Sequence, residues 1–157
     1  MTVVHVMRHA KAKNRAEWTE PDELRPLTKR GRRQAEALAE RLRDEQPARL
    51  VSSPYLRCVE TLDTLARALD LPIETTELLA EGGDGARALD LVLSLSRSEP
   101  AVVCCTHGDV LFELLRQVAA AGVTLDGPLD APVASTWALE VVEDQVVGAL
   151  FVERPAT

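Results

Sequence analysis

Apolar residues in this sequence form short runs that alternate with longer stretches of helical spacing. Three of the runs, at residues 2–7, 49–52 and 101–106, are bounded by polar residues or proline, as buried strands are. The third run reads Ala-Val-Val-Cys-Cys-Thr and is almost wholly apolar, which is typical of a parallel strand covered on both faces. The pattern therefore predicts strands at these three places.

Four helices are predicted from apolar residues that recur every three or four positions. They cover roughly residues 28–46, 54–69, 86–97 and 110–121. Thr28 is the expected N-cap of the first helix, and Ser53 is that of the second, where Pro54 would occupy the first helical position. A brief extended piece is expected near residues 71–73, and a Gly-rich loop at 78–85.

The alternation of strands and helices, ended by a predicted β-hairpin over residues 135–152, indicates an α/β fold. We expect a three-layer sandwich in which helices cover both faces of a largely parallel central sheet. The 157 residues suit a single domain, 1–157, because no repeat, linker or second core interrupts the pattern. Residues 10–26 are polar and broken by proline, and a loop of that length tends to be functional.

The balance of charged residues limits the classes of partner. The net charge is −7, from 25 acidic and 18 basic residues, which argues against non-specific binding to nucleic acid polymers or anionic membranes. The basic residues crowd residues 8–33, so the acidic total is still compatible with a local basic pocket for an anionic substrate.

The cysteines and the N-terminal residues indicate the compartment. The three cysteines are odd in number, and two of them, Cys104 and Cys105, are adjacent, which disfavours a disulfide framework. The apolar start is too short for a signal peptide and is interrupted by His5 and Arg8. No stretch approaches the ~20 apolar residues of a membrane span. We therefore expect a cytoplasmic protein with no membrane partner.

Histidine and arginine residues follow the ends of the predicted parallel strands. Strand by strand, the chemically active residues are Arg8 and His9, then Ser53 and Arg57, then His107 and Gly108. Ligands of open α/β sheets bind beyond the carboxyl ends of the strands, so we expect these residues to converge.

This set of side chains suits a phosphoryl group. Arginine stays charged and binds phosphate oxygens with a two-pronged fork, and a neutral imidazole with a pKa near ~6.5 is a usable nucleophile. A second imidazole can donate to a phosphate oxygen, and a helix beginning near Ser53 or Gly108 adds backbone N–H donors. No histidine and carboxylate cluster has the spacing of a metal site, so neither a metal nor another cofactor is expected.

Four motifs in this order resemble the histidine phosphatase superfamily, also called phosphoglycerate mutase-like. They are Val6–Ala10, Arg25–Thr28, Ser52–Thr61 and Thr106–Gly108. Ala10 stands where many members have glycine, which resembles the short subgroup that includes the SixA phosphohistidine phosphatases. Residues 8–27 are also similar to the phosphatase domain fused to Nudix hydrolases in actinobacterial MutT-like proteins, but no Nudix part is expected before it here. The resemblance implies the phosphoglycerate mutase-like fold.

The resemblance also implies roles for the motif residues. His9 would accept the phosphoryl group as a phosphohistidine, and Arg8, Arg57 and His107 would line the phosphate pocket. Arg25 falls in a segment that approaches the pocket in the SixA-like subgroup.

Other residues are assigned more loosely. Glu81 matches the position of the family's proton donor, a Glu or Asp between the second and third motifs, although SixA-like members often lack an evident donor. Ser53 and Gly108 are expected to contact the substrate. Lys11, with Lys13 and Arg15, would either solvate the loop or hold a second phosphate of an extended substrate. The absence of the long insertions typical of mutases indicates hydrolysis rather than phosphate shuttling.

Three functions remain open from the sequence. The first is hydrolysis of a phosphomonoester or a protein phosphohistidine through His9. The second is a nucleotide-directed phosphatase, which the MutT-like similarity and the basic loop favour. The third is a non-catalytic module that binds a phosphorylated small molecule or phosphoprotein, against which the complete set of His9, Arg8, Arg57 and His107 argues.

Overall fold

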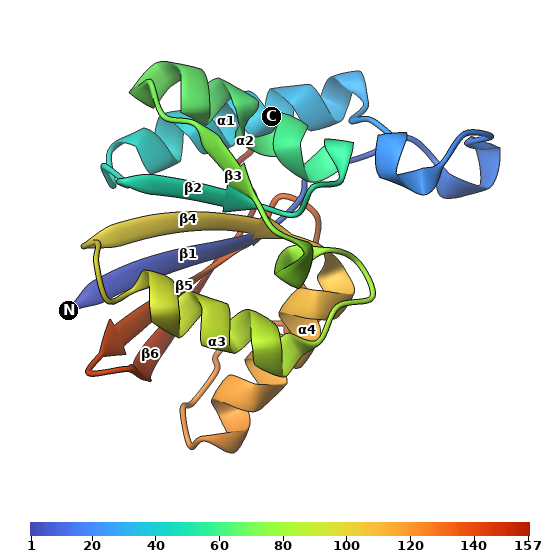
Figure 1. The fold of residues 1–157 in the computed structure, drawn as a ribbon. Helices are drawn as coiled ribbons and strands as arrows, with labels where there is room; N and C mark the ends of the chain where they lie inside the picture. The colour runs from blue at the N-terminus through green and yellow to red at the C-terminus, as the bar shows by residue number, and fades with distance from the viewer.

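A six-stranded sheet in the order β3-β2-β4-β1-β5-β6 forms the centre of the computed structural model, which describes residues 1–157 (Figure 1). Its strands are β1 (Thr2–Arg8), β2 (Arg49–Ser52), β3 (Ile73–Thr75), β4 (Ala101–Thr106), β5 (Thr136–Val142) and β6 (Gln145–Val152). The first four are parallel to one another, and β5 alone runs against them, because β6 reverses direction again in the terminal hairpin. The prediction of an α/β fold with a largely parallel sheet is therefore confirmed.

Helices cover both faces of the sheet and complete three layers (Figure 1). Helices α1 (Lys29–Arg43) and α2 (Leu56–Leu69) pack together on one face, and α3 (Gly85–Leu95) and α4 (Gly108–Ala120) pack together on the other. Three short 3-10 helices, η1 (Arg15–Glu17), η2 (Asp22–Leu24) and η3 (Glu77–Leu79), lie in the connections. No helix combines the length and apolar character needed to cross a membrane.

The sheet divides the apolar core in two because successive strand residues point to opposite faces. In β4, Val102 and Cys104 join the cluster that contains the buried residues of α3 and α4. Val103 and Cys105 join the cluster formed with α1 and α2. All six residues of β4 are buried, as the uninterrupted apolar run predicts.

The start of the second helix differs from the expectation. Ser53 and Pro54 do not begin it, because the chain bends at Pro54 and Tyr55, Tyr55 has extended backbone angles, and α2 begins only at Leu56. The Ser53 hydroxyl accepts a hydrogen bond from the Tyr55 N–H at 3.2 Å and also bonds the imidazole of His107 at 2.8 Å. Ser53 is thus a turn residue engaged with a neighbouring strand end, and not a helix cap.

The ends of three adjacent strands lie level at one edge of the sheet. Arg8 of β1 pairs with Thr106 of β4, and Ser52 of β2 pairs with Cys105. The residues that follow these strands therefore emerge side by side, which is the convergence expected at the carboxyl edge of a parallel sheet.

Candidate active site

His9 follows β1 and is held by its backbone from two sides. Its N–H donates to the carbonyl oxygen of Thr106 at 3.1 Å, and its own carbonyl oxygen accepts from the N–H of Ala134 at 3.1 Å. The imidazole Nδ1 lies 2.8 Å from the carbonyl oxygen of Ala10. A carbonyl can only accept, so Nδ1 carries the proton and Nε2 keeps a free lone pair.

Burial sets the protonation state of His9. Only 8% of the residue is exposed, and this burial is the main cause that lowers its pKa to about 3. The hydrogen bond to Ala10 raises the pKa, whereas the positive charges of nearby residues, including Arg57 and Arg8, lower it. At neutral pH the imidazole is therefore uncharged, with Nε2 available as a nucleophile.

Three buried N–H groups around His9 have no hydrogen-bond partner in the protein. They are Arg8 Nε, Arg57 Nε and His107 Nδ1, and they account for three of the five unpartnered buried side-chain polar atoms in the chain. Buried donors are almost always satisfied, because leaving one unpaired is costly. Their concentration beside one nucleophile indicates a place for a ligand rich in acceptor oxygens, such as a phosphoryl group.

His107 caps the start of α4, and its ring is fixed by Ser53. The Ser53 hydroxyl bonds His107 Nε2 at 2.8 Å, and the ring centroids of His107 and His9 are 5.4 Å apart in an edge-on arrangement. Cys58 Sγ lies 3.6 Å from the same Nε2. The Ser53 hydroxyl accepts from the Tyr55 N–H and has no other acceptor for its own proton, so it donates to Nε2. Nδ1 therefore carries the ring proton and is left without a protein partner.

Arg57 is fully buried and is held by a residue that the sequence analysis did not select. Its NH1 donates to the backbone carbonyl of Asp22 at 2.9 Å, and its NH2 donates to Asp22 Oδ2 at 3.0 Å. Asp22 Oδ1 accepts in turn from Arg25 Nε at 2.9 Å. Partial burial raises the pKa of Asp22, but the hydrogen bonds and charges of the two arginines prevail and lower it to about 2. An acid inside an irregular loop has no periodicity that could assign it a partner 35 residues away.

Glu81 lies beside the same arginine cluster. Its Oε1 is 2.6 Å from Arg15 NH2 and 3.4 Å from Arg57 NH2. The loop that carries Glu81 is tied to α4, because the Gly82 N–H donates to Asp109 Oδ2 at 2.8 Å. The structure thus brings the suggested proton donor to the site, where Arg15 binds it.

A cavity of about 270 Å³ unites most of the expected residues. Its lining consists of Arg8, His9, Lys11, Ala12, Arg15, Arg25, Glu81, Gly108, Asp109 and Val133. Ser53, Arg57 and His107 lie behind this lining and are each 1% exposed or less. Six of the nine residues selected from the sequence thus line one cavity, and the other three, including the expected substrate contact Ser53, lie behind it.

Gly108 allows the close approach of Arg8. A Cβ at this position would lie 3.1 Å from Arg8 Cζ and Nε, which is tighter than ordinary van der Waals contact. Arg8 is also anchored by a 2.8 Å bond from NH1 to the carbonyl oxygen of Ala131. The absent side chain thus leaves room for a guanidinium whose Nε is unpartnered.

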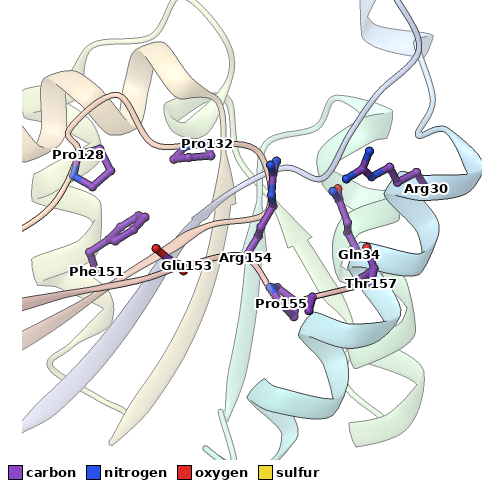
Figure 2. Close-up of a pocket in the computed structure, with 10 residues that line it drawn as sticks. Arg30, Gln34, Pro128, Pro132, Phe151, Glu153, Arg154, Pro155 and Thr157 are labelled. Atoms are coloured by element: carbon purple, nitrogen blue, oxygen red, sulfur yellow. The ribbon is translucent and has the colours of Figure 1, made fainter.

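A larger cavity, of about 610 Å³, lies elsewhere, between α1, the loop before β5 and the last residues of the chain (Figure 2). Arg30 and Gln34 line it from α1, and Phe151 and Arg154 line it from the C-terminal segment. Its lining contains no histidine, cysteine or serine, so it offers no nucleophile comparable with His9. Nowhere in the chain do three or more His, Cys, Asp or Glu residues gather as they would around a metal ion.

Comparison with known proteins agrees with this geometry. The model of the histidine phosphatase superfamily (branch 1) matches residues 4–86. An 8-oxo-(d)GTP phosphatase of Mycolicibacterium smegmatis is 32% identical over 155 residues, which cover 97% of this chain and 48% of that protein. The chain thus spans about half the length of this curated relative.

Solved structures share the fold. The protein histidine phosphatase SixA complexed with tungstate superposes with a TM-score of 0.78 at 22% identity, over 96% of this chain and 94% of that one. A mycobacterial glucosyl-3-phosphoglycerate phosphatase in complex with VO3 gives a TM-score of 0.74 at 20% identity, over 99% of this chain and 100% of that one. At these identities the likeness establishes the three-layer architecture.

Proposed function

Because the chain belongs to the histidine phosphatase superfamily, we propose that it hydrolyses a phosphomonoester or a protein phosphohistidine through a phosphohistidine intermediate on His9. One observation carries this proposal. The unprotonated Nε2 of a buried neutral imidazole lies among three buried N–H donors that have no partner in the protein. A tetrahedral anion with several acceptor oxygens would satisfy these donors while presenting its phosphorus to the nucleophile.

In the first step, the lone pair of His9 Nε2 forms a bond to phosphorus as the bond to the leaving group breaks. Arg8, Arg57 and His107 donate to the equatorial oxygens and stabilise their charge. The positive charge that develops on the phosphorylated ring is stabilised by the bond from Nδ1–H to the Ala10 carbonyl. The leaving group takes its electron pair and a proton, for which the proposed donor is Glu81 on the cavity wall, in its protonated form, or a water molecule.

In the second step, water attacks the phosphorus of phospho-His9, and the electron pair of the broken P–N bond returns to Nε2. One proton of the water stays on inorganic phosphate, and the other passes to Glu81 or to solvent. The protein groups supply the positive charge that the reaction needs, and full activity in EDTA is expected.

The nucleotide-directed alternative has its own support. The relative that is 32% identical is an 8-oxo-(d)GTP phosphatase, and Lys11 and Arg15 on the cavity wall offer cations for a second phosphate.

The proposal also includes a cytoplasmic location, which the three free and buried cysteines support.

Release of inorganic phosphate from p-nitrophenyl phosphate, a phosphohistidine protein and a nucleotide panel, all in EDTA, tests the proposal. We expect turnover by the wild type and none by His9→Ala. Intact mass under alkaline conditions should show a phosphoryl adduct on the wild type alone. Binding of vanadate without turnover of any substrate would favour the non-catalytic module instead.

A further inference from the structure

Asp22 binds the end of the Arg57 guanidinium through two different hydrogen-bond acceptors. Its backbone carbonyl accepts a hydrogen bond from NH1 at 2.9 Å, and its carboxylate accepts one from NH2 at 3.0 Å. The third guanidinium nitrogen, Nε, has no hydrogen-bond partner. The side chain of Arg57 has no exposed surface, so these two hydrogen bonds hold a fully buried cation in place. We propose that Asp22 is a positioning residue that turns the Nε–H of Arg57 toward the phosphoryl group, an inference that rests on the proposed function.

The carboxylate of Asp22 is itself fixed by a second arginine. Arg25 donates from Nε to Asp22 Oδ1 at 2.9 Å and from NH1 to the carbonyl oxygen of Lys13 at 2.6 Å. Arg25 is 6% exposed, so its donors are largely shielded from water. A continuous series of contacts therefore connects the loop after His9 to the guanidinium of Arg57.

Two physical effects follow from this arrangement. A buried guanidinium is costly without a counter-charge, and Asp22 supplies one that does not depend on a bound substrate. Fixing the guanidinium beforehand also removes a reorganisation that would otherwise occur when substrate binds. Both carboxylate oxygens and the backbone carbonyl of Asp22 already accept hydrogen bonds from Arg25 and Arg57, so Asp22 acts through Arg57 and not on the substrate.

The test compares Asp22→Asn with Glu23→Gln. The first substitution keeps the size of the side chain and the backbone acceptor but removes the charge that faces Arg57 and Arg25. Glu23 lies next to it in η2, is exposed and makes no ion pair, so it is a matched control. We expect Asp22→Asn to lower kcat/KM for p-nitrophenyl phosphate by up to ~100-fold, because misplacing a catalytic group costs about that much, and Glu23→Gln to leave it unchanged.

A double-mutant cycle distinguishes positioning from a general structural effect. In an Arg57→Ala background, Asp22→Asn should lower kcat/KM by less than ~2-fold, since the residue through which it acts is gone. An equal loss in both backgrounds, or full activity of Asp22→Asn, would overturn the proposal. If thermal melts show that Asp22→Asn destabilises the fold, Asp22→Ser takes its place in the cycle.

Phosphate affinity separates this inference from the proposed function. Isothermal titration with inorganic phosphate, run on the same four proteins, measures the role of Asp22 without any turnover. If Asp22→Asn weakens phosphate binding in the wild-type background but not in the Arg57→Ala background, the result supports positioning. This conclusion holds even if no substrate is cleaved. A wild type that neither cleaves substrates nor binds phosphate contradicts both.

Discussion

The Nδ1–H of His9 donates to the carbonyl oxygen of Ala10, the next residue along the chain, at 2.8 Å. The bond uses no side chain from elsewhere in the protein, because the turn after β1 brings this carbonyl to the ring. It selects the tautomer in which Nε2 is unprotonated, and burial keeps that tautomer neutral. The local backbone therefore sets the tautomer of the nucleophile, and its burial sets the charge.

A pH titration of the His9 ring by NMR tests this state directly. We expect the neutral Nδ1–H tautomer throughout pH 8 to 4, because burial lowers the pKa of His9 to about 3. The resonance is assigned by its absence from the spectrum of His9→Ala. A midpoint near the ordinary histidine value of ~6.5 would contradict the buried neutral imidazole.

The same shift predicts an acid-dependent loss of stability. Between pH 6.5 and about 3, unfolded His9 binds a proton that folded His9 does not, so the free energy of unfolding falls as the pH falls through this window. Urea unfolding of wild type and His9→Gln at pH 7 and pH 4.5 should show a smaller decline for the variant. Equal declines in the two proteins would show that folded His9 titrates normally.

Removing the Ser53 hydroxyl should loosen His107. Ser53→Ala deletes the 2.8 Å bond to His107 Nε2, and we expect kcat/KM to fall roughly 10-fold as the ring loses its fixed orientation. Ser52→Ala is the matched control, because the buried Ser52 hydroxyl bonds the Ser53 carbonyl and not the histidine. A loss of activity that is no larger than that of Ser52→Ala would assign Ser53 to stability alone.

The parts of the site that follow regular strands could be predicted from the sequence. His9 and His107 each come directly after a buried apolar run, and parallel pairing of β1 with β4 brings such ends together. Arg57 lies in the first turn of α2, so its distance from the strand end is fixed by the helix. Periodicity is enough to place residues of this kind at one edge of the sheet.

Contacts that depend on irregular backbone could not be predicted in this way. Asp22 reaches Arg57 because the loop between β1 and α1 contains two short 3-10 helices, the second of which carries Asp22. No repeat in the sequence encodes that path. The sequence predicts that the Ser53 hydroxyl caps α2, but its hydrogen bond to His107 depends on the relative placement of β2 and β4. Such pairings are decided by tertiary geometry.

Gly108→Ala should separate activity from stability. A Cβ here would lie 3.1 Å from Arg8 Cζ and Nε, and Arg8 cannot retreat freely because its NH1 is bound to the Ala131 carbonyl at 2.8 Å. Displacing the guanidinium moves an unpartnered Nε donor away from the phosphoryl position, so we expect kcat/KM to fall by about 10-fold.

Alanine nevertheless favours a helix over glycine by up to ~1 kcal/mol, so the midpoint of thermal unfolding of Gly108→Ala should stay level or rise. The control is Gly148→Ala in β6, where a Cβ would meet the flexible end of Glu140 at 3.4 Å, far from the strand ends that form the site. We expect the control to retain full activity. If Gly108→Ala is as active as the wild type, the close packing of Arg8 against Gly108 does not position a group that the reaction uses.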